Sequence, residues 1–422
     1  MNDPQEAVML RQEAPYVIDS AGRDLPGEAA RLRERGPVVR VVLPGGVSAW
    51  AVTDLDLIKQ LLTDSRASKD AYRHWPAWAG GEVDESWQMS MWVSVRNMLT
   101  AYGEEHARLR RLVAGAFTAR RTADLRPRVE RITARLLDGL AAVPPGAAVD
   151  VRNEFARPLS VLVMGETLGL PEDLHADLQR MVDVLFKTTA EPEEARANQY
   201  ELYALLTELV AARRSAPGTD LTSELIAARD EDGGEGLSEK ELVDTLLLLI
   251  GAGTETTVNL IDQAVHGLIT HPAQLALVLG GEATWDSVID ETLRHQPVVA
   301  NVPFRFAVED IEVGGVTIPK GDPILLSLAA AARCPHRHGA DADQFDVARP
   351  SRRDHVPFGY GVHHCVGRPL ARLEVSIALE SLFARYPRMA AAVPEAELAV
   401  RESFISSGHV ALPVVLVPGA AA

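Results

Sequence analysis

One cysteine of the sequence stands where it could bind a metal or act as a nucleophile. Cys365 lies near the end of the stretch FGYGVHHCVG, residues 358–367, whose glycines permit turns and close backbone approaches that a Cβ would block. After Pro369 the apolar residues recur with helical spacing, so the cysteine comes just before a predicted helix N-terminus. The helix dipole and free N–H groups there favour a thiolate, the form that binds soft metals and attacks electrophiles.

The other interpretation of Cys365 is a small buried apolar residue, because free cysteines are among the most buried residue types. The flanking glycines argue against it, since they serve no packing purpose in a core helix. His363 lies two residues before the cysteine. The residues alone therefore predict a reactive or metal-bound thiolate.

A long apolar helix is the second candidate element. Ser238 and Glu241 form a capping box, and the apolar pattern that follows need not stop before Pro272, which gives a helix of roughly thirty residues. Two central glycines, Gly251 and Gly253, each cost about 1 kcal/mol relative to alanine. We interpret them as thinning the helix so that a flat ligand can lie against it.

The centre of this helix also carries polar groups. Leu248, Ala252 and Thr256 share one face because they are four residues apart. Glu255 and Thr256 place a carboxylate and a hydroxyl beside the thinned segment, where they can pass protons. The alternative for Thr256 is a hydrogen bond from its hydroxyl to the helix backbone. A dinucleotide-binding turn at Gly251 is rejected because Thr256 replaces the third glycine and the capping box starts a helix upstream.

Two further pairs of charged residues have helical spacing. His106 and Arg110 lie on one helix face, either as a solvated basic face or as donors to a dianionic ligand. Glu291 and Arg294 are three residues apart, which taken alone describes a weak surface pair.

The elements around these groups follow from local patterns. Residues 36–53 predict a β-hairpin, and residues 304–328 predict short strands separated by glycine turns. The tryptophan-rich segment 72–97 is either a loop pinned by aromatic anchors or a binding loop. Residues 400–422 alternate like strands.

Composition excludes several classes of function. The net charge of −17 argues against a general nucleic-acid binder, and 47% hydrophobic residues suffice for a large core. With only two cysteines, Cys334 and Cys365, neither a disulfide framework nor a cysteine-rich zinc site is expected. No signal-peptide or membrane-spanning run is recognised, so a cytoplasmic protein without membrane contact is expected.

Taken in order, these motifs resemble the bacterial, soluble cytochromes P-450 of actinobacterial type. The resemblance covers nearly the whole chain and rests on the cysteine stretch, Glu291-x-x-Arg294, the helix centre 252–256 and His106-x-x-x-Arg110. It implies a mainly α fold with small β-sheets (α+β), a triangular prism with a long central helix over the haem. One domain, 1–422, is expected, with β-rich parts at about 36–53 and 304–328 and helical parts at about 100–300 and 366–386.

The resemblance also implies a cofactor, haem b, with O2 as co-substrate and Cys365 as the iron ligand. Glu255 and Thr256 match the family's proton-handling pair. The residues implied around the haem are His106, Arg110, Arg305 and His363 for the propionates, and Ala252, Gly253, Phe358, Gly359 and Gly367 for the rest of the group. The residues implied to be structural are Glu291, Arg294 and Arg349.

The implied activity is insertion of one oxygen atom of O2 into a C–H bond of a bulky, mostly apolar molecule, with steroids ranked first and macrolides or polyketides second. A monomer receiving electrons from a ferredoxin and its NAD(P)H-dependent reductase is expected. The predicted basic docking patch is Arg108, Arg111, Arg368 and Arg372. The predicted substrate pocket is Trp92, Leu248, Gly251, Ala252, Val298, Val299, Ala300, Phe404 and Ile405. The alternatives are a peroxide-driven or non-hydroxylating haem enzyme of the same fold, or a haem-binding protein without turnover.

Overall fold

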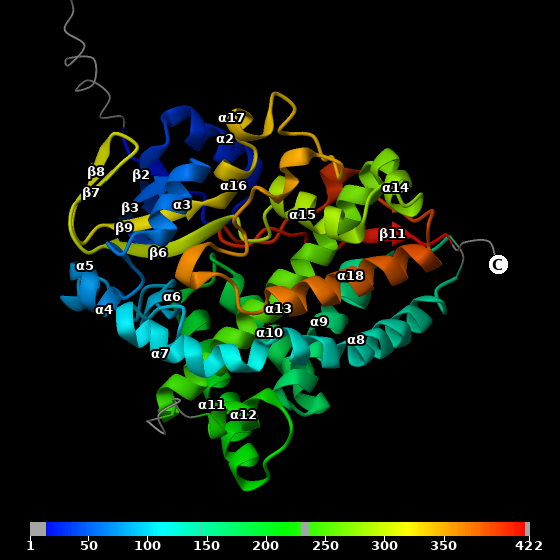
Figure 1. The fold of residues 1–422 in the computed structure, drawn as a ribbon, viewed down its shortest axis with the longest axis horizontal. Helices are drawn as coiled ribbons and strands as arrows, with labels where there is room; N and C mark the ends of the chain where they lie inside the picture. The colour runs from blue at the N-terminus through cyan, green and yellow to red at the C-terminus, as the bar shows by residue number, and fades with distance from the viewer. Residues whose placement is uncertain (1–13, 145, 229–235, 418–422) are drawn as a thin grey trace, which may run out of the picture.

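Most strands lie at one side of the molecule, a small sheet lies at the other side near the C-terminus, and helices form most of the rest (Figure 1). The computed structural model describes residues 14–144, 146–228 and 236–417. The acidic, glycine-rich stretch at 230–236 therefore lies almost wholly outside the described residues. Among the described residues, no helix combines the length and apolar character needed to cross a bilayer.

The predicted hairpin at 36–53 is confirmed. Its strands pair antiparallel from Val38 opposite Val52 to Leu43 opposite Val47. Gly45 and Gly46 take φ values of 78° and 79° at the turn, a backbone region that side chains with a Cβ rarely adopt. The largest sheet has the order β1 (Tyr16–Val17), β2 (Val38–Leu43), β3 (Val47–Val52), β9 (Pro323–Ser327), β6 (Asn301–Ala307) and β4 (Ala67–Ser68).

Two small sheets complete the β structure. The predicted segment 400–422 is described only to residue 417, and in this part the prediction of several strands is largely wrong, because only β11 forms a strand. Elsewhere in that segment the pairing is limited to single bridges, Val299 to Ser406 and Val400 to His409. The small sheets are β10 (Ala390–Ala391), β11 (Pro413–Val415) and β5 (Ala148–Asp150) in that order, and the pair β7 (Ile311–Val313) and β8 (Val316–Ile318).

The long central helix is confirmed as α13, Glu239–Thr270, 32 residues, and both hydrogen bonds of the capping box are present. It runs through the middle of the helical layer (Figure 1). The helices that contact it are α9 (Arg157–Leu168), α10 (His175–Phe186), α11 (Pro192–Ser215), α12 (Leu221–Ala227), α14 (Pro272–Leu279), α15 (Trp285–His295) and α18 (Arg368–Arg385). The remaining helices are α2 (Leu25–Arg35), α3 (Leu55–Thr63), α4 (Ala71–His74), α5 (Pro76–Ala79), α6 (Met91–Ser94), α7 (Gly103–Ala114), α8 (Ala119–Leu140), α16 (Leu328–Ala332) and α17 (Pro335–His338).

The central glycines of α13 have a different role from the predicted one. A Cβ at Gly253 would lie 2.9 Å from Met164 Sδ on α9, and one at Gly251 would lie 3.0 Å from a methyl group of Leu185 on α10. Both glycines therefore let neighbouring helices approach α13 closely. The helix is thinned toward α9 and α10, and the face that a flat ligand could use carries Ala252 instead.

The tryptophan-rich segment is mostly an anchored loop. Trp75, Trp78 and Trp87 are buried, and Trp75 stacks on Phe306 with ring centroids 5.3 Å apart. Trp92 is only partly buried and meets Phe186 of α10 edge-on. Three tryptophans thus attach the segment to the largest sheet, and the fourth faces the helices.

Glu291 and Arg294 form a buried pair rather than a weak surface one. Arg294 donates through Nε and Nη2 to the two Glu291 oxygens at 2.8 and 2.7 Å, and both side chains are fully buried. Arg349 Nε lies 3.7 Å from Glu291 Oε1. Arg294 also donates to the carbonyls of Ala342 and Gln344. The cluster therefore ties α15 to the irregular segment before the cysteine stretch.

Candidate active site

The loop that carries Cys365 is shaped by two glycines. Gly359 has a φ of 74°, and a Cβ there would lie 2.8 Å from the carbonyl oxygen of His363. Gly361 has a φ of 67°, and a Cβ there would lie 2.8 Å from the carbonyl oxygen of Leu62 in α3. Either substitution would push the loop away, so both positions require glycine. A backbone hydrogen bond from the Cys365 N–H to the Phe358 carbonyl, 2.7 Å long, closes this loop.

The sulfur itself is accessible and hydrogen-bonded. Cys365 is exposed, whereas Cys334 is buried. The backbone N–H groups of Gly367 and Arg368 donate to the thiol and lower its pKa, but loss of water around the sulfur raises that pKa by more. The N–H groups at the helix N-terminus therefore favour a thiolate, as predicted, but burial of the thiol opposes them. A bound metal cation would also favour the thiolate.

The face of α13 that carries Ala252 borders an open space. Ala252 is exposed, and Leu248 and Thr256 on the same face are partly exposed, although most of this helix is buried. Val366, next to Cys365, packs on the apolar cluster that includes Leu249 of α13. The cysteine loop and the open face of the helix are thus brought into the same region.

The two proton-handling candidates of α13 have separate partners. Thr256 Oγ1 donates to the Ala252 carbonyl at 2.5 Å, so the backbone hydrogen bond that was the alternative for this hydroxyl is present. Glu255 is buried and lies 2.8 Å from Arg401 Nε and 3.5 Å from Arg152 Nη2. It also accepts from Asn259 Nδ2 at 3.0 Å. The carboxylate is therefore held in a buried ionic network, while the hydroxyl lies on the open face.

The predicted cations are gathered beside the cysteine loop. The rings of His106 and His363 lie 4.3 Å apart, and Arg110 Nη2 donates to the His364 carbonyl at 2.5 Å. His106 Nε2 and Arg305 Nε are buried without a hydrogen-bond partner. No described carboxylate forms an ion pair with Arg110 or Arg305. The described protein residues supply no hydrogen-bond acceptor for His106 Nε2 and Arg305 Nε, so a bound ligand is needed to satisfy them.

Burial and mutual repulsion disturb the protonation of this cluster. Burial lowers the pKa of Arg305 to about 10. Burial and the charges of Arg305 and His106 lower the pKa of His363 to about 2. Burial and the nearby arginines also lower the pKa of His106. A bound dianion would reverse these shifts, because an opposite charge stabilises the protonated forms. Cations without a partner, an exposed thiol and an open helix face together fit haem, a flat metal complex with two propionates.

Sequence reasoning missed one member of this cluster, Lys69, which follows β4 and is 4% exposed. A single lysine in an irregular segment forms no sequence pattern with other residues that would indicate a binding role. Only the pairing of β4 with β6 brings it beside Arg305.

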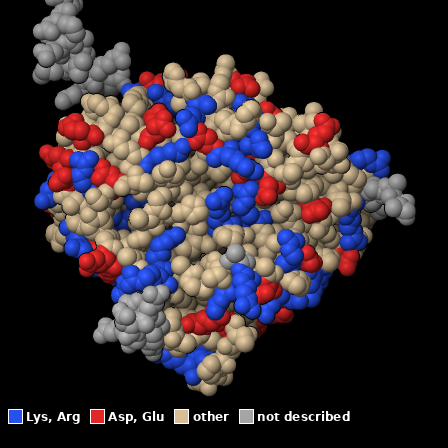
Figure 2. Space-filling model, viewed as in Figure 1, with Lys and Arg blue, Asp and Glu red and all other residues tan. Residues whose placement is uncertain are grey.

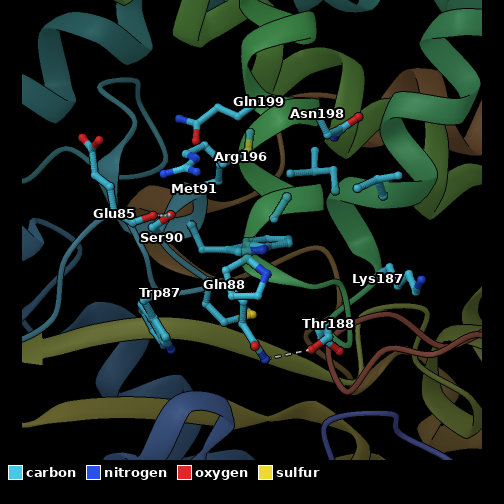
Figure 3. A pocket seen from close by; sticks show the side chains of 16 residues that line it. Glu85, Trp87, Gln88, Ser90, Met91, Lys187, Thr188, Arg196, Asn198 and Gln199 are labelled. Atoms are coloured by element: carbon cyan, nitrogen blue, oxygen red, sulfur yellow. Dashed lines mark hydrogen bonds between the residues drawn. The ribbon is translucent and has the colours of Figure 1, made fainter.

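A recess opens between the tryptophan-rich segment and the helices α10 and α11 (Figure 3). Gln88 Nε2 donates to the Thr188 carbonyl across it at 3.1 Å. Asn198 Oδ1 is buried there without a partner. Trp92 lines the recess and was predicted; the α10–α11 side was missed, because helical propensity does not tell which helix covers the loop. Its members on that side are Val184, Leu185, Lys187, Thr188, Pro192, Ala195, Arg196, Asn198 and Gln199.

The predicted substrate pocket divides into open and closed positions. Val299 is partly exposed, as are Leu248 and Trp92, and Ala252 is exposed. The others are enclosed by protein: the Ala300 N–H donates to the Ile405 carbonyl at 2.7 Å, and Phe404 belongs to the apolar cluster behind the largest sheet. The enclosed positions are Gly251, Val298, Ala300, Phe404 and Ile405.

The predicted basic patch is weaker than its arginines suggest. Figure 2 shows Lys and Arg gathered across the centre of the face that carries α7, α15 and α18. Arg108 forms an ion pair with Glu241, and Arg372 with Asp286 and Asp290. Arg368 is exposed, has no described carboxylate partner and lies 5.8 Å from the Phe358 ring.

Known proteins resemble this chain over nearly its full length. Residues 168–276 and 285–389 match the family model described as Cytochrome P450. The 2-hydroxy-5-methyl-1-naphthoate 7-hydroxylase of Streptomyces carzinostaticus is 42% identical over 97% of this chain and 99% of its own. CYP154A1 from Streptomyces coelicolor A3(2) has a TM-score of 0.90 at 52% identity, covering 95% of this chain and 100% of that one. A testosterone-bound CYP154C4 from Streptomyces sp. ATCC 11861 has a TM-score of 0.92 at 42% identity, covering 96% and 99%.

Proposed function

The chain belongs to the cytochrome P450 family of oxidoreductases, and from this premise we propose that it is a haem-thiolate monooxygenase that hydroxylates a bulky, mostly apolar small molecule. The observation that carries the proposal is the combination of the exposed Cys365, the open Ala252 face of α13, and the buried His106 Nε2 and Arg305 Nε, which lack hydrogen-bond partners. Haem b bound there supplies the activation of O2 and the oxidation of a C–H bond.

The chain's own residues bind and orient the cofactor. Cys365 is proposed as the iron ligand. The backbone N–H groups of Gly367 and Arg368 would stabilise the negative charge of its thiolate. Charge-assisted hydrogen bonds from the four predicted cations hold the two propionates. The proposed propionate partners are His106, Arg110, Arg305 and His363, and the residues proposed against the rest of the group are Ala252, Gly253, Phe358, Gly359 and Gly367.

Proton supply is assigned to α13. The Thr256 hydroxyl lies on the open face and donates its proton in a hydrogen bond to the Ala252 carbonyl. Glu255 is proposed to support proton entry from the opposite side of the helix, where its carboxylate forms ion pairs with Arg401 and Arg152. This pair favours oxygen activation with external electrons over the peroxide-driven alternative. The electrons are proposed to come from a ferredoxin and its NAD(P)H-dependent reductase.

Steroids are the first proposed substrate class. The open positions Leu248, Ala252 and Val299 are apolar, and Trp92 adds an aromatic wall at the recess. The testosterone-bound relative supports this ranking. Macrolides or polyketides are the second proposed class, and the naphthoate hydroxylase adds aromatic acids to the test panel.

A spectrum of the reduced, carbon-monoxide-bound protein tests the haem-thiolate assignment. We expect the red-shifted Soret band of thiolate ligation, its loss in Cys365→Ala, and its retention in the matched control Cys334→Ala. A band typical of histidine-ligated haem in the unmodified protein would overturn the assignment.

Turnover with a ferredoxin, its reductase and NADPH, compared with turnover on peroxide alone, then separates the monooxygenase from the peroxide-driven alternative. Spectral shifts on titration with steroids, aromatic acids and macrolides rank the substrate classes. Haem without turnover in either system would favour the haem-binding alternative.

A further inference from the structure

Two buried cations face each other across a strand pair. Strand β4 pairs antiparallel with β6, with Ala67 opposite Ala307 and Ser68 opposite Phe306. Continued one residue past the end of β4, this register points Lys69 toward Arg305, whose charge acts on the lysine. Both side chains are 4% exposed. Like charges opposite each other on neighbouring strands are destabilising, the more so when water is excluded.

The protein leaves most of the lysine's hydrogen-bonding capacity unused. Lys69 Nζ donates to the Pro303 carbonyl at 2.8 Å, which is one of three possible donations. The adjacent carboxylate, Asp70, forms no ion pair with Lys69: its Oδ1 accepts from Arg73 N at 3.2 Å and lies 3.7 Å from Arg96 Nη1, and its Oδ2 is buried without a hydrogen-bond partner. No described carboxylate forms an ion pair with Lys69.

The charge of Lys69 depends on what enters the space beside it. Burial and the charge of Arg305 hold the pKa of Lys69 well below its ordinary value. Lys69 adjoins Arg305, so its charge acts on the cluster of Arg305 and His363 that is proposed to hold the propionates. The other charged or titratable groups of that cluster are His106 and Arg110, which add no negative charge. An anion placed among these groups would restore the ammonium form.

We propose that Lys69 is a fifth member of the propionate site, with its ammonium group bound to the haem propionate that Arg305 also holds. The proposal rests on the assignment of a haem-thiolate centre to Cys365. Its consequence is electrostatic as well as structural. A cation near the haem favours the reduced, less positive iron, so Lys69 raises the reduction potential in addition to tightening haem binding.

The test compares holoenzyme variants at one position. Lys69→Gln keeps an N–H donor for the Pro303 carbonyl and removes the charge, Lys69→Arg keeps the charge, and Lys320→Gln removes a charge from an exposed turn. In Lys69→Gln we expect a more negative midpoint potential and about tenfold or faster transfer of haem to apomyoglobin, the size expected for losing one hydrogen bond between charged groups. Lys69→Arg and Lys320→Gln should stay close to the unmodified protein.

Reconstitution with haem dimethyl ester identifies the partner of Lys69. If the ammonium acts through a propionate, the difference between the unmodified protein and Lys69→Gln should largely disappear with the esterified haem. Unchanged potential and haem transfer in Lys69→Gln, or a difference that survives esterification, would overturn the proposal.

Folding failure is also informative. If Lys69→Arg yields haem-containing protein and Lys69→Gln does not, the result supports the requirement for a positive charge at this position. If neither variant yields haem-containing protein, the proposal is overturned. These outcomes are distinct from failure of the proposed function, because a normal thiolate Soret band with unchanged potential rejects only the role of Lys69.

Discussion

At the scale of single residues, one substitution tests the proton-supply role proposed for the hydroxyl of Thr256. This hydroxyl donates to the Ala252 carbonyl and lies on the open face of α13, where the proposed haem would bind. We expect Thr256→Ala to keep haem and to consume NADPH, while a larger share of the electrons appears as hydrogen peroxide and product formation falls about tenfold or more. Peroxide and product are measured against NADPH consumed.

Thr270 provides the matched control. Its hydroxyl makes the same type of bond, to the His266 carbonyl at 2.7 Å, near the end of the same helix. Thr270→Ala should therefore keep normal coupling. Equal coupling in the Thr256 and Thr270 variants would leave Thr256 with a backbone role only.

A buried acid on α18 predicts a pH dependence of stability. Burial raises the pKa of Glu374 to about 8. The folded protein then holds a proton between about pH 4.5 and pH 8 that the unfolded chain has lost, so the free energy of unfolding falls as pH rises through that window. The slope from this group is at most about 1.4 kcal/mol per pH unit.

Glu374→Gln should flatten that slope and make the protein more stable than the unmodified chain at pH 8. Urea unfolding of the haem-containing protein at several pH values measures the difference. Glu130→Gln, exposed on α8, is the control and should leave the slope as it is. A slope that persists in Glu374→Gln would assign the proton to another group.

At the scale of elements, the Glu291–Arg294 pair joins α15 to the segment before the cysteine loop. Removing one partner leaves the other charge buried, which costs about 3–5 kcal/mol. We expect Glu291→Gln to lower the free energy of unfolding by that amount and to reduce the yield of haem-containing protein. Urea unfolding and haem content measure both effects.

An exposed pair is the control for the buried one. Arg180 and Glu201 lie 2.7 Å apart, with about half of each side chain exposed. Glu201→Gln should change stability by no more than about 1 kcal/mol. A similar decrease in the free energy of unfolding in both variants would mean that burial does not increase the contribution of the Glu291–Arg294 pair to stability.

The elements that sequence reasoning predicted are those whose signals are local. The capping box at Ser238 and the apolar run after it define α13, and a glycine turn between β-rich runs defines the β2–β3 hairpin. Residues 400–417 form backbone hydrogen bonds with several separate segments, but among them only Pro413–Val415 form a regular strand, so the alternating pattern there does not correspond to one continuous sheet.

The candidate site was predictable to a similar degree. Cys365 and its glycines carry a long, specific pattern, and so does the spacing of His106 and Arg110. Lys69 was missed because its place depends on the register between two strands far apart in sequence. The close packing of Gly253 on Met164 was missed for the same reason, since nothing local identifies the helix that lies across it.

At the scale of the whole molecule, the proposed ferredoxin is expected to dock on the surface nearest the cysteine loop. The chain has a net charge of −17, yet Lys and Arg gather at the centre of the face in Figure 2. Several of those arginines are paired with carboxylates, which reduces the field they present. Beside the loop, Tyr360 and Val362 expose 46% and 63% of their surface, and Arg368 adds a charge. We therefore expect an acidic ferredoxin to dock on these three residues.

The charge reversal Arg368→Glu tests this docking surface. It should slow electron transfer from the ferredoxin about tenfold at low ionic strength, because steering by charge acts on the association rate. The difference should shrink as salt rises, since a Debye length of about 8 Å at physiological salt screens exposed charges. Arg23→Glu makes the same change at an exposed position away from the cysteine loop and should have little effect. Because Arg368 N contacts the sulfur, an unchanged Soret band must accompany the slower transfer. A rate that falls equally in both variants would reflect net charge alone and would reject this docking surface.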